Sequence, residues 1–220
     1  MQYLGLALYA EGRTDYYFLR PLLQRLCEDI CAKESPHSIE FAEVLGLDTA
    51  PHLKNAPREQ RILDAAKEAR GAWRILFVHT DGASNPSYAR EHLAQPAIDL
   101  LREDWGDTGI GVAVIPFRET EAWAICDGDA LRQVLGTTLT PTELGLPATS
   151  AAIEGTSDPK AVLKNAFLAT KPSDRRKRQG VSPMLNALGE QVALHRLRQL
   201  SGFMTLETEL RSALRTLRIL

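Results

Sequence analysis

The fold is indicated first by Tyr3-Leu4-Gly5-Leu6-Ala7-Leu8-Tyr9-Ala10-Glu11-Gly12-Arg13-Thr14-Asp15, an apolar run that ends in Glu11-Gly12 and leads directly into a helical pattern. Such a run predicts a parallel strand, and open α/β sheets bind their ligands at the carboxyl ends of these strands. Gly12 permits a tight turn there, and Thr14 or Asp15 can cap the helix. Glu11 is therefore placed to ligate a metal or to act as a general acid or base, unless it is simply part of a polar turn.

The same alternation continues along the first half of the chain. Apolar runs predict strands at 4–9, 38–45, 74–79 and 111–116, and helical spacing predicts helices at 15–33, 57–69 and 87–105. This order predicts an α/β fold, a parallel sheet of about four strands flanked by helices. Past residue 128 no strand is expected; residues 137–159 are expected to form a loop. Helices are predicted from Asp158-Pro159-Lys160, at 183–200 and at 205–219, the last capped by Thr205. We thus expect an α/β domain at 1–127 and a helical region at 128–220 packed on it.

Composition excludes several classes of protein. The chain has 220 residues, of which 44% are apolar and 25% charged, as in an ordinary globular protein. No apolar run reaches the ~18 residues of a membrane span, and no signal peptide is recognisable. The three cysteines do not suggest a disulfide scaffold, and Cys27 and Cys31 are expected as buried side chains rather than as a metal clip with His37. We therefore expect a cytoplasmic protein that does not contact a membrane.

Charge is distributed unevenly. Residues 160–220 hold 12 of the 26 Lys and Arg but 4 of the 28 Asp and Glu, so this end carries +8 and the remainder −10. A basic end on an acidic body is typical of a protein that meets a polyanion. The run Arg175-Arg176-Lys177-Arg178 could neutralise phosphates of a nucleic acid without reading its bases. A solvated loop would give the same pattern.

Acidic residues follow three of the four predicted strands. Glu11 follows the first, Asp81 the third, and Glu119 and Glu121 the fourth. Because the carboxyl ends of parallel strands meet at one edge of a sheet, these groups can converge. Carboxylate oxygens suit Mg²⁺ or Mn²⁺, which in turn polarise phosphate oxygens. Lys160 could contact a scissile phosphate, or be an ordinary exposed lysine at a helix start.

Together these motifs resemble the Toprim domain of topoisomerases, primases and OLD-type nucleases, whose pattern is a strand, Glu-Gly, a helix, and a later strand ending in Asp-x-Asp. Glu11–Asp15 resembles the first motif. The chain is more closely similar to a Toprim-like bacterial family of unknown function. The motifs that carry this resemblance, besides Glu11–Asp15, are Glu119-Thr120-Glu121-Ala122-Trp123, Asp158-Pro159-Lys160 and residues 203–210.

The resemblance implies a metal-dependent nuclease acting on DNA or RNA, with Glu11 as general base or metal ligand and Asp81 as metal ligand. It also implies a partner ATPase of ABC or related type and a role in defence against phage. The chain departs from the family in one place, because both His79-Thr80-Asp81 and Asp81-Gly82-Ala83 lack one acid of Asp-x-Asp. His79 could ligate Mn²⁺ but is a poor Mg²⁺ ligand, and Glu119 or Glu121 could supply the missing carboxylate. Three alternatives remain open: a nuclease, nucleotidyl transfer without a primase-type zinc motif, and a catalytically degenerate subunit that binds nucleic acid or protein.

Overall fold

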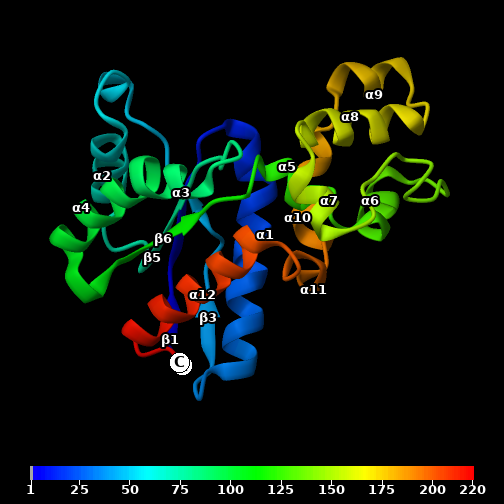
Figure 1. Ribbon diagram of the computed structural model, residues 1–220. Coiled ribbons are helices and arrows are strands. Elements are labelled where there is room, and N and C mark those ends of the chain that lie inside the picture. Colours follow the sequence, from blue (N-terminus) through cyan, green and yellow to red (C-terminus); the bar gives the residue numbers. More distant parts are fainter. Residues whose placement is uncertain (1) are drawn as a thin grey trace.

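A four-stranded parallel sheet lies at the centre of the first half of the chain in the computed structural model, which describes residues 2–220 (Figure 1). Its strand order is β4 (Leu45–Gly46), β2 (Leu6–Tyr9), β5 (Ile75–His79) and β6 (Ile110–Val114), with each neighbouring pair parallel. A separate parallel pair joins β1 (Gln2–Leu4) to β3 (Ile39–Phe41). The predicted α/β fold with about four parallel strands and a helical C-terminal region is confirmed.

Two predicted strands are each divided in the structure. The run at 4–9 breaks at Gly5 into β1 and β2, and the run at 38–45 yields β3 and β4. Gly5 is the point of closest approach to the segment before β5: an added Cβ would lie 2.2 Å from the carbonyl oxygen of Ala72. The Gly5 carbonyl also accepts a hydrogen bond from Arg74 N at 2.9 Å. Gly5 therefore lies outside both ladders: β1 before it pairs with β3, and β2 after it pairs with β4 and β5.

Helices flank the sheet and make up the C-terminal half. They are α1 (Arg13–Glu34), α2 (Arg58–Glu68), α3 (Pro86–Ala89), α4 (Gln95–Trp105), α5 (Thr120–Ala124), α6 (Gly128–Leu135), α7 (Ser150–Gly155), α8 (Pro159–Ala169), α9 (Asp174–Gln179), α10 (Leu185–Gln191), α11 (Leu194–Leu197) and α12 (Ser201–Thr216). The predicted helix at 87–105 is interrupted by a π-helical turn at Arg90–Ala94. Pro96 explains why α4 starts anew there, because it lacks the N–H that a continuous helix would use.

Three predictions for the C-terminal half were wrong. Residues 137–159 contain α7, and the helix predicted at 183–200 is divided into α10 and α11. The last helix begins at Ser201, so Thr205 is inside α12 and does not cap it. Ser201 is instead held by Glu154 of α7, whose Oε1 accepts from both its N and its Oγ at 2.6 Å. A cap supplied by a distant helix leaves no local signal in the sequence.

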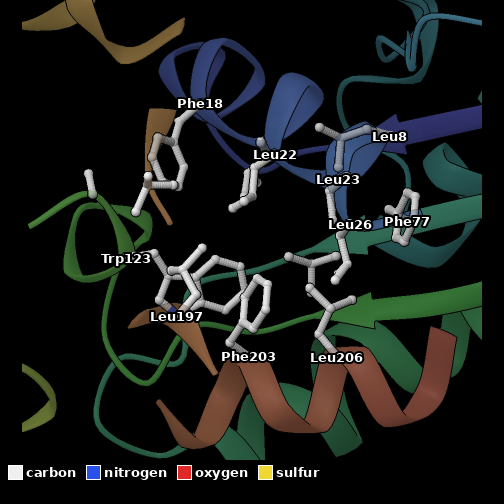
Figure 2. Packing of buried hydrophobic residues seen from close by; sticks show 14 of the residues in the cluster. Leu8, Phe18, Leu22, Leu23, Leu26, Phe77, Trp123, Leu197, Phe203 and Leu206 are labelled. Carbon is white, nitrogen blue, oxygen red and sulfur yellow. The ribbon is translucent and has the colours of Figure 1, made fainter. Parts of the chain in front are cut away.

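The core covers both faces of the sheet. On one face α1, α12 and the short C-terminal helices pack against Leu8 and Phe77; on the other α2 and α4 pack against Leu76 and Val78. Figure 2 shows the first cluster, where Trp123 lies against Phe203. Their rings meet edge to face with centroids 5.4 Å apart. The C-terminal helical region therefore packs on the α/β region in one continuous core.

A polar clasp fastens α12 to α1 beside this core. The guanidinium of Arg198 binds both oxygens of Glu207, a buried carboxylate, and donates from its NH2 to Asp29 Oδ2 at 2.6 Å. Four leucines at helical spacing near the C-terminus, Leu206, Leu210, Leu214 and Leu217, are all buried. Within residues 2–220, none of the helices combines the length and apolar character needed to cross a membrane.

Candidate functional site

Glu11 and Asp81 meet at the carboxyl edge of the sheet. Glu11 lies two residues past the end of β2 and Asp81 two past the end of β5, and these strands are paired with Tyr9 opposite Val78. Glu11 Oε2 accepts hydrogen bonds from Thr80 Oγ1 at 2.8 Å and from Asp81 N at 3.2 Å. The side chain of Glu11 is otherwise exposed. The expected convergence of these two strand ends is therefore present, with Glu11 held at one oxygen and facing solvent.

The loop after β5 is joined to the loop after β6, which brings Asp81 beside Glu119. Gly82 N donates to Pro116 O and Ala83 N donates to Arg118 O, both at 3.1 Å. An added Cβ on Gly82 would lie 2.3 Å from Pro116 O, so no side chain fits at this position. Ala83 has a φ of 45°, a left-handed conformation that is strained for a residue other than glycine. A constrained loop thus fixes the distance between two acidic groups.

Glu119 and Asp81 each carry a buried oxygen that lacks a hydrogen-bond partner. These atoms are Glu119 Oε2 and Asp81 Oδ1. Burial raises the pKa of Glu119, and the negative charge of Asp81 raises it further, while Lys160 partly opposes the shift. Buried polar atoms in proteins are nearly always hydrogen-bonded, so two orphans on neighbouring loops indicate an unsatisfied demand for positive charge.

Glu121 lies deeper in the same edge, in the first turn of α5. It is buried, and this burial raises its pKa, with further contributions from the charges of Asp15 and Glu119. Lys160 on α8 lies nearby: its Nζ is 3.8 Å from Glu121 Oε1 and its side chain is mostly exposed. Asp158 caps α8 by accepting from Ala161 N at 2.7 Å, as its sequence predicts. Lys160 is therefore the one predicted basic residue that reaches the acidic edge.

His79 ends β5 and is fully buried beneath these acids. Glu11 N donates to its Nδ1 at 3.4 Å, so in the neutral ring Nε2 carries the proton and donates to Thr120 Oγ1 at 3.0 Å. Asp81 Oδ1 lies 3.5 Å from Nε2. Both ring nitrogens are engaged within the protein, and a metal could take one only if a hydrogen bond were broken. In this arrangement His79 positions the loops after β2 and β6.

Asp15 belongs to the site although the sequence indicated only a helix cap. It is buried in the first turn of α1, where its Oδ2 accepts from Gly12 N at 2.9 Å and lies 3.8 Å from His79 Nδ1. Gly12 has an extended φ of −117°, so a tight turn is not why glycine occurs here. An added Cβ would lie 2.9 Å from Asp15 Oδ2. Gly12 therefore leaves room for the carboxylate of Asp15 to turn inward. In the sequence, the only sign of this role was that Asp15 lies four residues after Glu11.

The donor chemistry of this edge fits a hard divalent cation. Among the residues that the structure describes, no group of three or more His, Cys, Asp or Glu side chains is placed to hold a metal ion. Mg²⁺ usually binds through one or two carboxylates, keeping waters and substrate phosphates as its other ligands. Asp81 Oδ1 and Glu119 Oε2 are two unsatisfied oxygens of that kind. Glu11 and Glu121 are the further carboxylates within the same edge.

The basic run predicted to bind nucleic acid lies away from this edge. Arg175, Arg176, Lys177 and Arg178 are exposed on α9, which Figure 1 shows (yellow) beyond α8 and outside the sheet. Arg176 lies over the ring of Phe167, 5.9 Å from its centroid, and Lys177 pairs with Asp174 at 3.5 Å. Two of the four cations are thus partly engaged within the protein, and none contacts the acidic edge.

Comparison with known proteins adds no relative: no family model, no curated protein and no solved structure matches this chain. The function of this chain is therefore inferred from the geometry of Glu11, Asp81, Glu119, Glu121 and their neighbours.

Proposed function

We propose that this protein is a Toprim-like nuclease that hydrolyses phosphodiester bonds of DNA or RNA with the help of Mg²⁺ or Mn²⁺. One observation carries the proposal: the buried orphan oxygens of Asp81 and Glu119, held on joined loops within reach of Glu11. A bound divalent ion would neutralise phosphate oxygens and lower the pKa of an attacking water. The pKa values of Glu119 and Glu121 are raised, as expected for buried carboxylates whose charge is not balanced by a bound cation.

Each side chain has a role that its position supports. Glu11 acts as the general base, because one of its oxygens is fixed by Thr80 and Asp81 while its side chain faces solvent, where a water can give up a proton. Asp81 and Glu119, whose buried oxygens lack hydrogen-bond partners, would hold the cation, and Glu121 would be a further carboxylate beside it. Lys160 binds a non-bridging phosphate oxygen, since its ammonium is exposed at the same edge.

The wider setting is also part of the proposal. The Toprim resemblance supports a cytoplasmic effector in defence against phage, acting with an ATPase of ABC or related type. The free cysteines Cys27, Cys31 and Cys126 suit a reducing compartment. The alternative is a degenerate subunit that binds nucleic acid or protein without cutting it. The buried orphan oxygens favour the enzyme, because a site without a cation would leave both oxygens desolvated and unpaired.

Cleavage of a labelled oligonucleotide tests the proposal. Purified wild-type protein, Glu11→Gln and a control, Glu40→Gln, are compared with Mn²⁺ or Mg²⁺ supplied; Glu40 is an exposed residue of β3, which belongs to the separate β1–β3 pair. We expect Glu11→Gln to lower the rate by about 10²–10⁴-fold and Glu40→Gln to leave it unchanged. Equal cleavage by wild type and Glu11→Gln would reject Glu11 as the base.

Metal binding supplies a second readout that does not depend on cleavage. We expect Mn²⁺ to raise the thermal unfolding midpoint of the wild type and to raise that of Asp81→Asn much less, because ligand binding to the native state stabilises it. A wild type that neither cleaves nor responds to Mn²⁺ or Mg²⁺ would favour the degenerate subunit.

A further inference from the structure

A second feature adjoins Glu11 on the side away from Lys160. It is a cavity of about 520 Å³ between the start of α1, the segment after β4 and the start of α2. Its lining includes the cationic residues Arg13, Lys54, Arg58 and Arg61 and the acidic residues Glu11 and Asp48. In Figure 1 this segment (cyan to teal) and the α8–α9 hairpin (yellow) lie to opposite sides of the α1 start (blue). The start of α1, with Glu11, therefore lies between this basic cavity and α8, which carries Lys160.

The four cations of this cavity have no acidic partner of their own. Among residues 2–220, Arg13, Lys54, Arg58 and Arg61 form no ion pair, whereas Lys67 and Arg70 further along the same segment both pair with Asp104. Arg58 is held by carbonyl oxygens instead, donating to His79 O at 2.7 Å and to Leu93 O at 3.2 Å. The Nε of Arg61 is buried without any hydrogen-bond partner. Carbonyls satisfy donors without cancelling charge, so the cavity keeps an excess of positive charge.

The cavity is built rather than incidental. The hydroxyl of Tyr16 accepts from Ala10 N at 3.0 Å and donates to Leu47 O, which joins α1 to the segment carrying the cations. Burial raises the pKa of Tyr16 to about 12, so this hydroxyl remains neutral and can donate at physiological pH. Arg58 lies over the ring of Tyr9, 5.8 Å from its centroid, and is fixed at the end of β5 through His79. The cavity and the acidic edge thus share a rigid wall that includes Glu11.

We propose that this cavity binds a phosphate of the nucleic-acid strand next to the phosphate that is cut. Arginine and lysine are the side chains that bind phosphate most strongly, through charge-assisted hydrogen bonds. The strand would cross Glu11 with one phosphate in the cavity and the next at Lys160 and the acidic edge. This inference rests on the proposed function for the identity of the strand, while the excess of unpaired cations carries it physically.

Binding measured without catalysis tests the cavity. Fluorescence anisotropy with a labelled single-stranded oligonucleotide, in EDTA, compares wild type, the double variant Arg13→Gln/Lys54→Gln, and a control with the same charge change, Lys33→Gln/Arg102→Gln. All four residues are exposed, so we expect both double variants to fold, which a melting curve of each checks. Each lost phosphate contact should weaken binding roughly tenfold and make the slope of log K against log salt shallower by about 0.7. The control should match the wild type.

The outcomes separate this inference from the proposed function. Equal affinity and salt slope in the double variant and the control overturn the cavity, whether or not the protein cleaves. A loss of affinity confined to the double variant supports the cavity even if the protein never cleaves; absence of cleavage would reject only the nuclease.

Competition by a mononucleotide identifies the source of the phosphate. Displacement of the oligonucleotide only at a far higher mononucleotide concentration supports a strand. The proposal of a strand phosphate is overturned if the mononucleotide binds more tightly than the oligonucleotide and the double variant loses only the mononucleotide. Arg61→Gln should weaken oligonucleotide binding in the same way, and a melting curve of this variant checks that it is folded.

Discussion

The backbone amide of Asp81 donates a hydrogen bond to Glu11 Oε2 across 3.2 Å, and this bond links the ends of β2 and β5. The candidate base and a candidate metal ligand are thereby held by each other, so neither can shift without moving its neighbour. Positioning of this kind matters because a catalytic group displaced by about 1 Å can lose on the order of 10²-fold in rate. The loop that carries Asp81 is therefore as important to the site as the carboxylates themselves.

We expect Gly82→Ala to separate the loops after β5 and β6. The new methyl group would lie 2.3 Å from Pro116 O, so Asp81 and Glu119 must move apart. The response of the melting midpoint to Mn²⁺ should shrink and the protein should lose stability. Gly155→Ala is the matched control, because nothing lies within 4 Å of its added Cβ at the end of α7. Identical Mn²⁺ responses in the two variants would show that the loop contact does not position the acids.

Glu119→Gln should stabilise the metal-free protein at neutral pH. The folded-state pKa of Glu119 is raised, so its contribution to stability is complete below its usual value and is lost as the pH rises through the raised value. At pH 7 the neutral amide should therefore raise the melting midpoint by roughly 1–2 °C, a modest gain because water screens a half-buried group. Near pH 4 the advantage should vanish. A lower midpoint for the variant at pH 7 without metal would contradict this account.

The fold and much of the site could be predicted because their signals are local. The strands β2, β5 and β6 are largely apolar runs, and Glu11, Asp81 and Glu119 follow these strands, whose carboxyl ends must share an edge. Features that depend on distant partners could not be predicted. His79 is engaged at one nitrogen by Glu11 after β2 and at the other by Thr120 of α5, and Asp15 turns inward only because Gly12 leaves room.

The basic cavity illustrates the same limit. Arg13, Lys54, Arg58 and Arg61 come from two helices and a loop and form no motif in the sequence. The conspicuous basic run, by contrast, lies on α9 at a distance from the acids. A run of like charges is visible in a sequence, whereas cations brought together by folding are not.

Arg198→Met should loosen α12 from α1. The change leaves the buried carboxylate of Glu207 with only Arg211 NH2 at 3.3 Å, and it removes the bond to Asp29. We expect a loss of about 2 kcal/mol in the free energy of unfolding, measured in urea, and a lower melting midpoint by about 4–8 °C. Arg102→Met is the control, since its pair with Asp99 is exposed and long at 3.8 Å.

The pH dependence of this clasp has a defined sign. Burial opposes it, but hydrogen bonds from Lys33 and Arg198 lower the pKa of Asp29 below its usual range. The stability that Asp29 contributes is therefore present above its usual pKa and is lost as the pH falls through its lowered value. The difference between wild type and Arg198→Met should narrow in strong acid. A difference that stays constant down to pH 2 would show that Asp29 adds nothing to the clasp.

The basic run on α9 should make about two phosphate contacts with nucleic acid, half of the number that four cations could make. Successive residues of a helix turn by about 100°, so Arg175 to Arg178 point in different directions and cannot all reach one phosphate backbone. Arg175 and Arg178, three apart, share a face, whereas Lys177 pairs with Asp174.

Replacing all four residues of the basic run by alanine should make the slope of log K against log salt for duplex DNA shallower by about 1.8, the value for two phosphate contacts, rather than by about 3.6. It should weaken binding to all sequences alike, because phosphate contacts carry no base information. The double variant Arg175→Ala/Arg178→Ala should reproduce nearly the whole effect, and Arg176→Ala/Lys177→Ala should leave the slope almost unchanged. An unchanged slope in the fourfold variant would assign the charge of α9 to a protein partner instead of to nucleic acid.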